Sequence, residues 1–238
     1  MTTASADSVP RIYVIIPAFN EEDSIGKVVS DIPEGLVHEV VVVSNGSTDL
    51  TETNASKAGA AVLREEQKGY GFACLRGLSY IAQKPQDQRP EIVVFIDGDY
   101  SDFPAEMPEV VQPIIEEGYD LVIGSRALGQ REKGSMQPQQ IFGNWLATSL
   151  IKLLYRVEFT DLGPFRAVAY DKLLEIDMQD TTFGWTVEMQ VKAAKMKMRC
   201  KEVPVNYRRR IGVSKITGTI KGTVLAGYKI LWTIFKLL

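Results

Sequence analysis

The sequence has few of the residues on which zinc sites, disulfide frameworks and histidine-based catalysis depend. Its 238 residues include two cysteines, Cys74 and Cys200, and one histidine, His38. Two isolated cysteines make neither a disulfide framework nor the Cys/His set of a usual zinc site. His38 has no nucleophile elbow to serve in a Ser-His-Asp triad. The low cysteine content also favours a reducing, cytosolic setting.

Long apolar runs and an excess of positive charge are absent as well. No stretch reaches 18 consecutive uncharged apolar residues, so we expect no membrane-spanning helix. Residues 1–10 are small and polar, unlike a signal peptide, and are expected to form a flexible tail. A net charge of -3 and a pI near 5.4 give no reason to expect a nucleic-acid partner. The remaining composition, 45% hydrophobic and 24% charged, is typical of a globular protein.

Short apolar runs alternate with helical segments through the first half of the chain. The runs that suit strands lie at 11–17, 39–44, 60–64, 92–96 and 119–124. Helical segments separate them at about 24–31, 50–58, 71–83 and 104–117. Alternation at this spacing predicts parallel βαβ units. We therefore expect an α/β fold whose ligands bind beyond the carboxyl ends of the strands.

After residue 125 the pattern becomes irregular. We expect a polar loop at 128–138, helices at 141–155 and 185–197, and strands at 166–170 and 200–207. The apolar helix at 141–155 could be a core helix or could touch a membrane surface. In the tail, Lys221, Lys229 and Lys236 fall within an arc of about 80° on a helical wheel. Such a helix could bind a bilayer interface, pack on the protein or oligomerise.

A pair of carboxylates follows the strand expected at 92–96. Asp97 and Asp99 are separated by Gly98, which lets the backbone turn. Two carboxylates so close would repel one another unless a cation joined them. Mg²⁺ or Mn²⁺ usually takes one or two carboxylates plus substrate phosphates, so one hypothesis is a metal-bound polyphosphate site. The alternative is a polar turn, because Asp-Gly is a common turn pair.

Several motifs follow one another along the chain. They are Pro17–Glu21 (PAFNE), Asn45–Asp49 (NGSTD), Lys68–Gly71 (KGYG) and Asp97–Asp99 (DGD). Their order resembles that of the family-2 glycosyltransferases, inverting enzymes of the GT-A fold that use nucleotide-sugar donors. Two later elements narrow the resemblance. Asp161–Arg166 is similar to the D-x-x-x-x-R element of polyprenyl-phosphate hexosyltransferases, and Arg210–Lys215 to the R-x-G-x-S-K motif of dolichyl-phosphate mannose synthases.

The resemblance implies a Rossmann-like, mostly parallel sheet in one GT-A domain over 11–215, followed by a C-terminal amphipathic helix at 216–238. The nucleotide-sugar half would cover about 11–125 and the acceptor half about 126–215. The residues implied for the donor are Pro17, Phe19, Glu21, Ser44, Gly46, Lys68, Gly71, Asp97 and Gly98. Asp99, with Asp97, would hold Mg²⁺ or Mn²⁺. The residues implied for the acceptor phosphate are Arg126, Arg166, Arg210, Ser214 and Lys215.

Ser44 departs from the family pattern, which usually has an aspartate that reads the base at this position. A serine can still hydrogen-bond a uracil or guanine edge, but the charge is lost. The donor therefore stays open between a UDP-hexose and a GDP-hexose. Loss of the charge also keeps open a non-catalytic, nucleotide-sugar-binding membrane protein.

The acceptor decides whether a catalytic base is needed. A lipid monophosphate has a second pKa near ~6 and is largely dianionic at neutral pH, so cations suffice to position it. A hydroxyl must lose its proton to a carboxylate, for which Asp161 and Glu188 are candidates. We expect hexose transfer to a polyprenyl phosphate by a cytoplasmic protein, peripheral on the inner face of the membrane. The alternative is a hydroxyl acceptor in a glycolipid or small molecule. The oligomeric state stays open, a homo-oligomer included.

Overall fold

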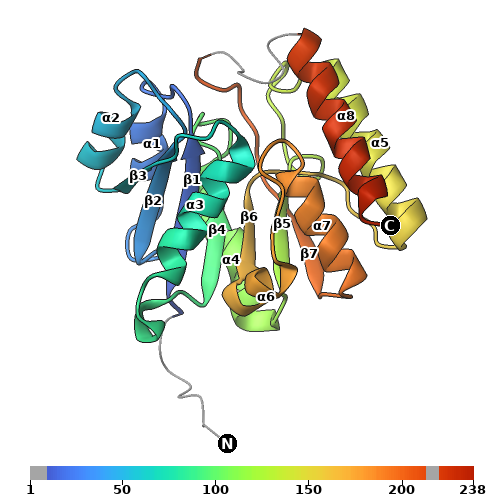
Figure 1. Cartoon of the computed structure of the whole chain (residues 1–238), viewed down its shortest axis with the longest axis horizontal. Coiled ribbons are helices and arrows are strands. Elements are labelled where there is room, and N and C mark those ends of the chain that lie inside the picture. Colours follow the sequence, from blue (N-terminus) through green and yellow to red (C-terminus); the bar gives the residue numbers. More distant parts are fainter. Residues whose placement is uncertain (1–9, 213–219) are drawn as a thin grey trace, which may run out of the picture.

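A seven-stranded sheet with helices on both faces organises the protein (Figure 1). The computed structural model describes residues 10–212 and 220–238. The strands are β1 (Ile12–Ala18), β2 (Glu39–Ser44), β3 (Ala61–Arg64), β4 (Ile92–Phe95), β5 (Leu121–Ser125), β6 (Arg166–Ala169) and β7 (Cys200–Pro204). The helices are α1 (Ile25–Ser30), α2 (Thr51–Lys57), α3 (Tyr70–Ala82), α4 (Met107–Glu117), α5 (Pro138–Tyr155), α6 (Tyr170–Ile176), α7 (Trp185–Lys195) and α8 (Ile220–Lys236). Two short 3₁₀ turns, Gln86–Gln88 and Pro104–Glu106, complete the described elements.

The sheet is parallel where the sequence alternates between strands and helices. Its order is β3-β2-β1-β4-β6-β5-β7, and β1 pairs in parallel with both β2 and β4. Only β6 runs against its neighbours, β4 and β5. The prediction of an α/β, mostly parallel sheet is confirmed. Helix α6 was not predicted, because the strand expected at 166–170 ends at Ala169 and Tyr170 begins the helix.

Apolar side chains fill both sides of the sheet. All seven residues of β1 are buried, as a strand with helices on both faces requires. One core packs against α3, α5, α7 and α8, where the Phe95 and Trp185 rings meet edge to face with centroids 5.8 Å apart. The other core packs α1, α2 and α4 on the opposite face. The central strands are therefore fixed from both sides, and their carboxyl ends form a rigid edge.

Helices α5 and α8 lie side by side at one end of the molecule (Figure 1). Five aromatic side chains of this pair are half exposed or more: Phe142, Trp145, Tyr228, Trp232 and Phe235. Lys229, expected among the lysines of a polar face, instead points inward and pairs with Asp180. Within residues 10–212 and 220–238, no helix has the length and apolar character needed to cross a membrane.

Candidate functional site

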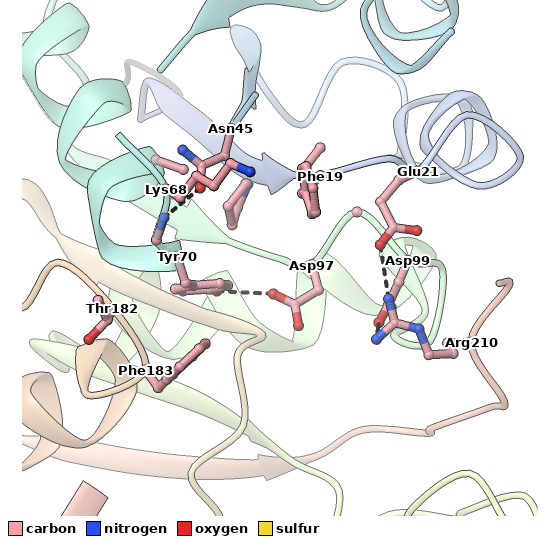
Figure 2. Close-up of a pocket in the computed structure, with 15 residues that line it drawn as sticks. Phe19, Glu21, Asn45, Lys68, Tyr70, Asp97, Asp99, Thr182, Phe183 and Arg210 are labelled. Carbon is pink, nitrogen blue, oxygen red and sulfur yellow. Dashed lines mark hydrogen bonds and ion pairs between the residues drawn. The ribbon is translucent and has the colours of Figure 1, made fainter. Parts of the chain in front are cut away.

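A cavity of about 530 Å³ opens at the carboxyl ends of β1, β2 and β4 (Figure 2). Phe19 and Glu21 reach it from the loop after β1, and Asp97 and Asp99 from the turn after β4. Its opposite wall is formed by Thr182 and Phe183, in the segment before α7. Motifs from distant parts of the chain thus meet at the edge where open parallel sheets bind ligands.

The part of this cavity near β1 combines a flat apolar surface with one cation. Pro17 and Phe19 line it, and the Lys68 ammonium lies 5.9 Å from the centroid of the Phe19 ring. A planar heterocycle can stack on such a ring, while the lysine attracts a phosphate. These three residues, predicted for the donor from two separate motifs, are brought together by the fold.

Asn45, rather than Ser44, lies at the cavity. Ser44 is the last residue of β2, has no exposed surface and does not line the cavity. The Asn45 amide donates to the carbonyls of Glu65 and Gln67 and accepts the Gly69 N–H at 2.7 Å. It therefore joins the loops after β2 and β3. Its position as the first residue beyond the strand is the signal that could have identified it.

The glycines of the KGYG turn are required by close packing. A Cβ on Gly71 would lie 2.0 Å from the Asp180 carbonyl oxygen, and one on Gly69 would lie 2.3 Å from that of Thr181. Gly69 also has a φ of 153°. Neither Gly71 nor Gly46, whose φ is 75°, lines the cavity, so both act through the backbone. The turn holds Tyr70 at the cavity floor.

The two carboxylates of the DGD turn have different surroundings. Tyr70 donates its hydroxyl to Asp97 at 3.0 Å. Burial, followed by the nearby charge of Asp99, raises the pKa of Asp97 to about 7. Asp99 is 6% exposed and accepts the Ser101 N–H at 2.9 Å. A Cβ on Gly98 would lie 3.4 Å from Ala18 and 3.4 Å from Ile25, so the turn lies close to β1.

Arg210 links Asp99 to Glu21 across the cavity (Figure 2). Its guanidinium lies 3.1 Å from an Asp99 oxygen and 2.9 Å from a Glu21 oxygen. These oxygens therefore already attract a cation, and hard carboxylate oxygens are the ligands that Mg²⁺ and Mn²⁺ prefer. The described residues hold no group of three or more His, Cys, Asp or Glu that could bind a metal by itself. A metal here would need further oxygens, such as those of a diphosphate.

A second cavity, of about 280 Å³, adjoins the first and extends between α5 and α8. Tyr70, Asp97, Asp99 and Arg210 line both cavities. Helix α8 contributes Ala226, Gly227 and Ile230, so its wall is small and apolar, whereas α5 contributes Gly143 and the polar side chains of Gln139, Gln140 and Asn144. A Cβ on Gly143 or Gly227 would meet nothing within 4 Å, which leaves both walls open.

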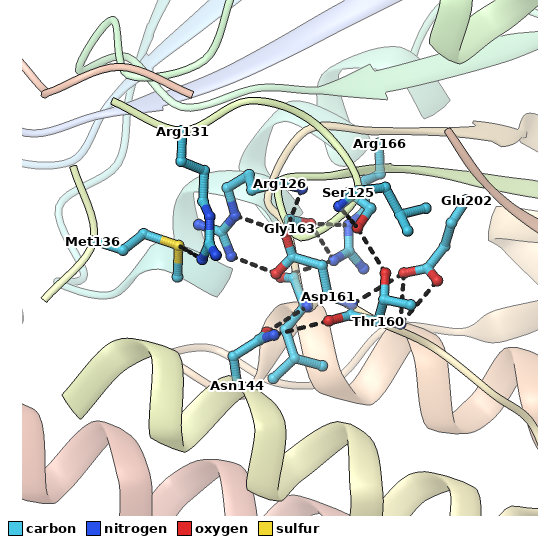
Figure 3. Close-up of polar contacts among 12 residues, drawn as sticks. Ser125, Arg126, Arg131, Met136, Asn144, Thr160, Asp161, Gly163, Arg166 and Glu202 are labelled. Carbon is cyan, nitrogen blue, oxygen red and sulfur yellow. Dashed lines mark hydrogen bonds and ion pairs between the residues drawn. The ribbon is translucent and has the colours of Figure 1, made fainter. Parts of the chain in front are cut away.

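Arg126 and Asp161 form a closed ion pair beside the second cavity (Figure 3). The guanidinium holds both carboxylate oxygens, at 2.7 and 2.8 Å, and the Arg126 N–H donates to the same carboxylate. Burial alone would raise the pKa of Asp161, but Arg126 outweighs it and the pKa is lowered. The Tyr207 ring lies 5.0 Å from the guanidinium. Asp161 thus orients Arg126 and is a poor proton acceptor.

A family model described as glycosyl transferase family 2 matches residues 13–175. The chain belongs to this family. An uncharacterised glycosyltransferase of Mycobacterium tuberculosis is 32% identical over 218 residues, which cover 90% of this chain and 94% of that one. An undecaprenyl-phosphate mannosyltransferase of Micrococcus luteus is 27% identical, with 89% and 90% covered.

Solved structures support the same fold for this family-2 chain. A crystal structure of glucosyl-3-phosphoglycerate synthase from Mycobacterium tuberculosis, with phosphoglyceric acid, superimposes with a TM-score of 0.75. The two sequences are 24% identical, and the match covers 96% of this chain and 80% of the other. At this identity the likeness concerns the fold. The predicted membership of the family and the GT-A type of fold are both confirmed.

Arg166 does not have the place that the family-2 resemblance implies. It has no exposed surface and donates to the carbonyls of Leu162, Gly163 and Thr186 (Figure 3). Burial lowers its pKa to about 10. A guanidinium whose donors serve backbone oxygens inside the protein cannot reach a phosphate in either cavity. Its expected role at the acceptor phosphate is therefore corrected to a structural one.

Glu188 likewise lies away from both cavities of this family-2 chain. It is 4% exposed and accepts backbone N–H groups from Gln179 and Asp180 at 2.6 to 3.1 Å. Lys192 pairs with it at 2.7 Å. These contacts hold the segment before α7, so the expected role of Glu188 as a base is not supported.

One buried carboxylate was not predicted. Asp102 is 1% exposed, and neither of its oxygens has a hydrogen-bond partner among the described residues. Burial, then the charge of Asp97, raises its pKa well above the ordinary range. Its place three residues after Asp99 was the available signal. Ser214 and Lys215, predicted for the acceptor phosphate, lie outside the described residues.

Proposed function

We propose that this chain is a metal-dependent inverting hexosyltransferase that moves a hexose from a nucleoside-diphosphate sugar to a polyprenyl phosphate. One observation carries the proposal: Asp97, Asp99 and Arg210 line two adjoining cavities. The first has the stacking ring and cation that suit a nucleotide, and the second has one apolar wall, from α8, that suits a lipid. A reaction between two substrates needs such a meeting point.

The first cavity is proposed to hold the donor. Pro17 and Phe19 would pack on the base, and Lys68 would meet the phosphates. Asp97 and Asp99 would hold Mg²⁺ or Mn²⁺, which supplies charge stabilisation to the departing nucleoside diphosphate. The glucosyl-3-phosphoglycerate synthase of similar fold was crystallised with Mn²⁺ and UDP. Binding of the metal and donor would replace the contact of Arg210 with Asp99, which frees the guanidinium for a phosphate.

The second cavity is proposed to hold the acceptor phosphate and the start of its chain. Both carboxylates considered as bases, Asp161 and Glu188, are engaged in ion pairs. A dianionic phosphate needs neither base. Arg210 would donate to it, together with Nη1 of Arg126, because the contacts of Arg126 with Asp161 use Nε and Nη2. Relatives that act on such acceptors include a UDP-N-acetylglucosamine–dolichyl-phosphate N-acetylglucosaminyltransferase of Methanococcus voltae, which is 28% identical.

The outer faces of α5 and α8 are proposed to dock on the inner face of the membrane. Trp145, Tyr228, Trp232 and Phe235 are 51% to 64% exposed and belong to the two helices that contribute to the second cavity. Tryptophan and tyrosine favour the headgroup level of a bilayer. In this arrangement residues 11–215 form the transferase domain, and the segment after them contributes the docking helix.

The test is transfer of radiolabelled sugar into lipid. UDP-glucose, GDP-mannose and UDP-N-acetylglucosamine are each supplied with polyprenyl phosphate and Mn²⁺ or Mg²⁺. We expect one donor to label an acid-labile lipid, and chelation of the metal to abolish the label. Metal-dependent donor hydrolysis without labelled lipid would indicate a hydroxyl acceptor instead. No reaction or binding with any donor would contradict the proposal.

The Glu188→Gln variant distinguishes a structural glutamate from a catalytic base. Glutamine retains an acceptor for the N–H groups of Gln179 and Asp180 but loses the pairing with Lys192. We expect transfer to fall less than about tenfold, whereas loss of a general base costs on the order of 10²–10⁴-fold. The melting temperature should fall at the same time. A fall in transfer of more than about 10²-fold at an unchanged melting temperature would instead indicate that Glu188 is a general base and that the acceptor is a hydroxyl.

A further inference from the structure

The wall of the first cavity opposite Phe19 belongs to a short segment, Gln179–Gly184, which we call the wall segment. It connects α6 to α7, and its Thr182 and Phe183 line the cavity (Figure 2). It has no regular secondary structure of its own, so side chains must fix its shape. Phe183 also lines the second cavity.

The Asp180 carboxylate sets the turn of the wall segment. One of its oxygens accepts the Thr182 N–H at 2.7 Å and the Gly184 N–H at 3.1 Å. On the other side of the segment, the Phe72 N–H donates to the Thr181 carbonyl at 3.0 Å. The wall segment is therefore joined to the start of α3, next to the KGYG turn, and its own shape depends on how the Asp180 carboxylate is oriented.

That orientation comes from α8. The Lys229 ammonium lies 2.8 Å from the second Asp180 oxygen, and the two side chains are 33% and 6% exposed. A nearly buried carboxylate needs a partner, because an unpaired charge is costly at this depth. Gly184 leaves the room for this contact, since a Cβ there would lie 2.4 Å from Asp180 and 2.6 Å from Thr233 of α8.

Lys229 lies at the edge of the α8 face that lines the second cavity. At about 100° per residue, Ala226 and Ile230 fall about 60° and 100° to one side of Lys229, and Trp232 and Tyr228 fall about 60° and 100° to the other. Ala226 and Ile230 line the second cavity, while Tyr228 and Trp232 point outward and are exposed. The same helix thus touches the second cavity with one part of its inner face and the wall of the first cavity with another.

We propose that Lys229 is a positioning residue for the first cavity, through which α8 orients Asp180 and thereby the wall segment. The nucleotide as ligand of that cavity rests on the proposed function, whereas the positioning of the wall segment does not. Because coupling between sites is reciprocal, anything that displaces the inner face of α8 should also change nucleotide affinity.

The test measures binding of UDP with Mn²⁺ by calorimetry to three variants of the 238-residue chain. We expect Lys229→Met to raise the Kd of UDP about tenfold, within the usual range of couplings. Lys229→Arg should restore affinity to within about twofold, since its guanidinium can reach the same carboxylate. Lys236→Met, which removes an exposed lysine from the same helix, is the matched control and should bind as the unmodified chain does.

Hydrogen exchange provides the readout that is independent of nucleotide. The amides of Thr182 and Gly184 should exchange faster in Lys229→Met without any ligand, and at the original rate in Lys229→Arg. Unchanged Kd and unchanged exchange in Lys229→Met would overturn the inference. If Lys229→Met does not fold, the same two measurements are made on Asp180→Asn. This variant keeps an oxygen that accepts the N–H groups of the turn but loses the ion pair with Lys229. If the unmodified chain does not bind UDP, the proposed function is contradicted but the role of Lys229 is not. Hydrogen exchange at Thr182 and Gly184 would still test whether Lys229 positions the wall segment.

Discussion

Sugar transfer by the Asp99→Ala variant is expected to be at least about 10³-fold slower than by the unmodified chain. A bound metal stabilises the departing diphosphate by several kcal/mol, and each 1.36 kcal/mol is a factor of about ten in rate. Asp99 lines both cavities and is nearly buried, so water is a poor substitute for its carboxylate. Initial rates of label transfer at saturating Mn²⁺ measure the effect.

The controls separate metal binding from loss of charge or fold. Asp171→Asn removes an exposed carboxylate from α6 and should leave the rate unchanged. Removal of metal from the unmodified chain should lower the transfer rate about as much as Asp99→Ala does. Added Mn²⁺ should restore the rate of the metal-depleted chain but not that of the variant. Retention of metal-dependent transfer above a tenth of the original rate in Asp99→Ala would refute the role of this aspartate.

The sheet could be predicted closely from the sequence because its strands are buried on both faces. The run at 39–44 coincides with β2, and that at 92–96 exceeds β4 by one residue. Such runs leave few alternatives once helices separate them. The direction of β6 could not be predicted, because a run as short as Arg166–Ala169 suits parallel and antiparallel strands alike. Helix α6 was missed for a related reason: it begins directly where β6 ends.

The candidate site was predictable where function depends on residues at the ends of strands. Phe19, Asp97 and Asp99 follow β1 and β4 directly, and parallel strands bring such residues to one edge. The sequence could not tell which polar side chains the protein uses internally. Arg166 belongs to a recognisable motif and Glu188 was a candidate base, yet backbone groups 20 and 8 residues away along the chain occupy them. Only the folded chain shows that these contacts exist.

Arg166→Leu is expected to lower the free energy of unfolding by about 3–5 kcal/mol, the range for breaking a buried charged network. The guanidinium donates to the Leu162 and Gly163 carbonyls and, at 3.0 Å, to that of Thr186. Leucine would leave these buried acceptors without donors. Urea unfolding without substrates measures the change. The surface variant Arg64→Leu, whose parent side chain is 74% exposed, should cost no more than about 1 kcal/mol.

Arg166→Lys separates this structural role from the phosphate role that the motif implied. Lysine keeps the charge, so a phosphate ligand would retain part of its affinity for the acceptor. A single ammonium cannot reach carbonyls on both sides of the guanidinium, so we expect Arg166→Lys to lose at least about 2 kcal/mol of stability. The KM for polyprenyl phosphate, measured below the melting temperature, should change less than about threefold. If Arg166→Lys has normal stability but a strongly raised KM for polyprenyl phosphate, Arg166 binds the acceptor phosphate after all.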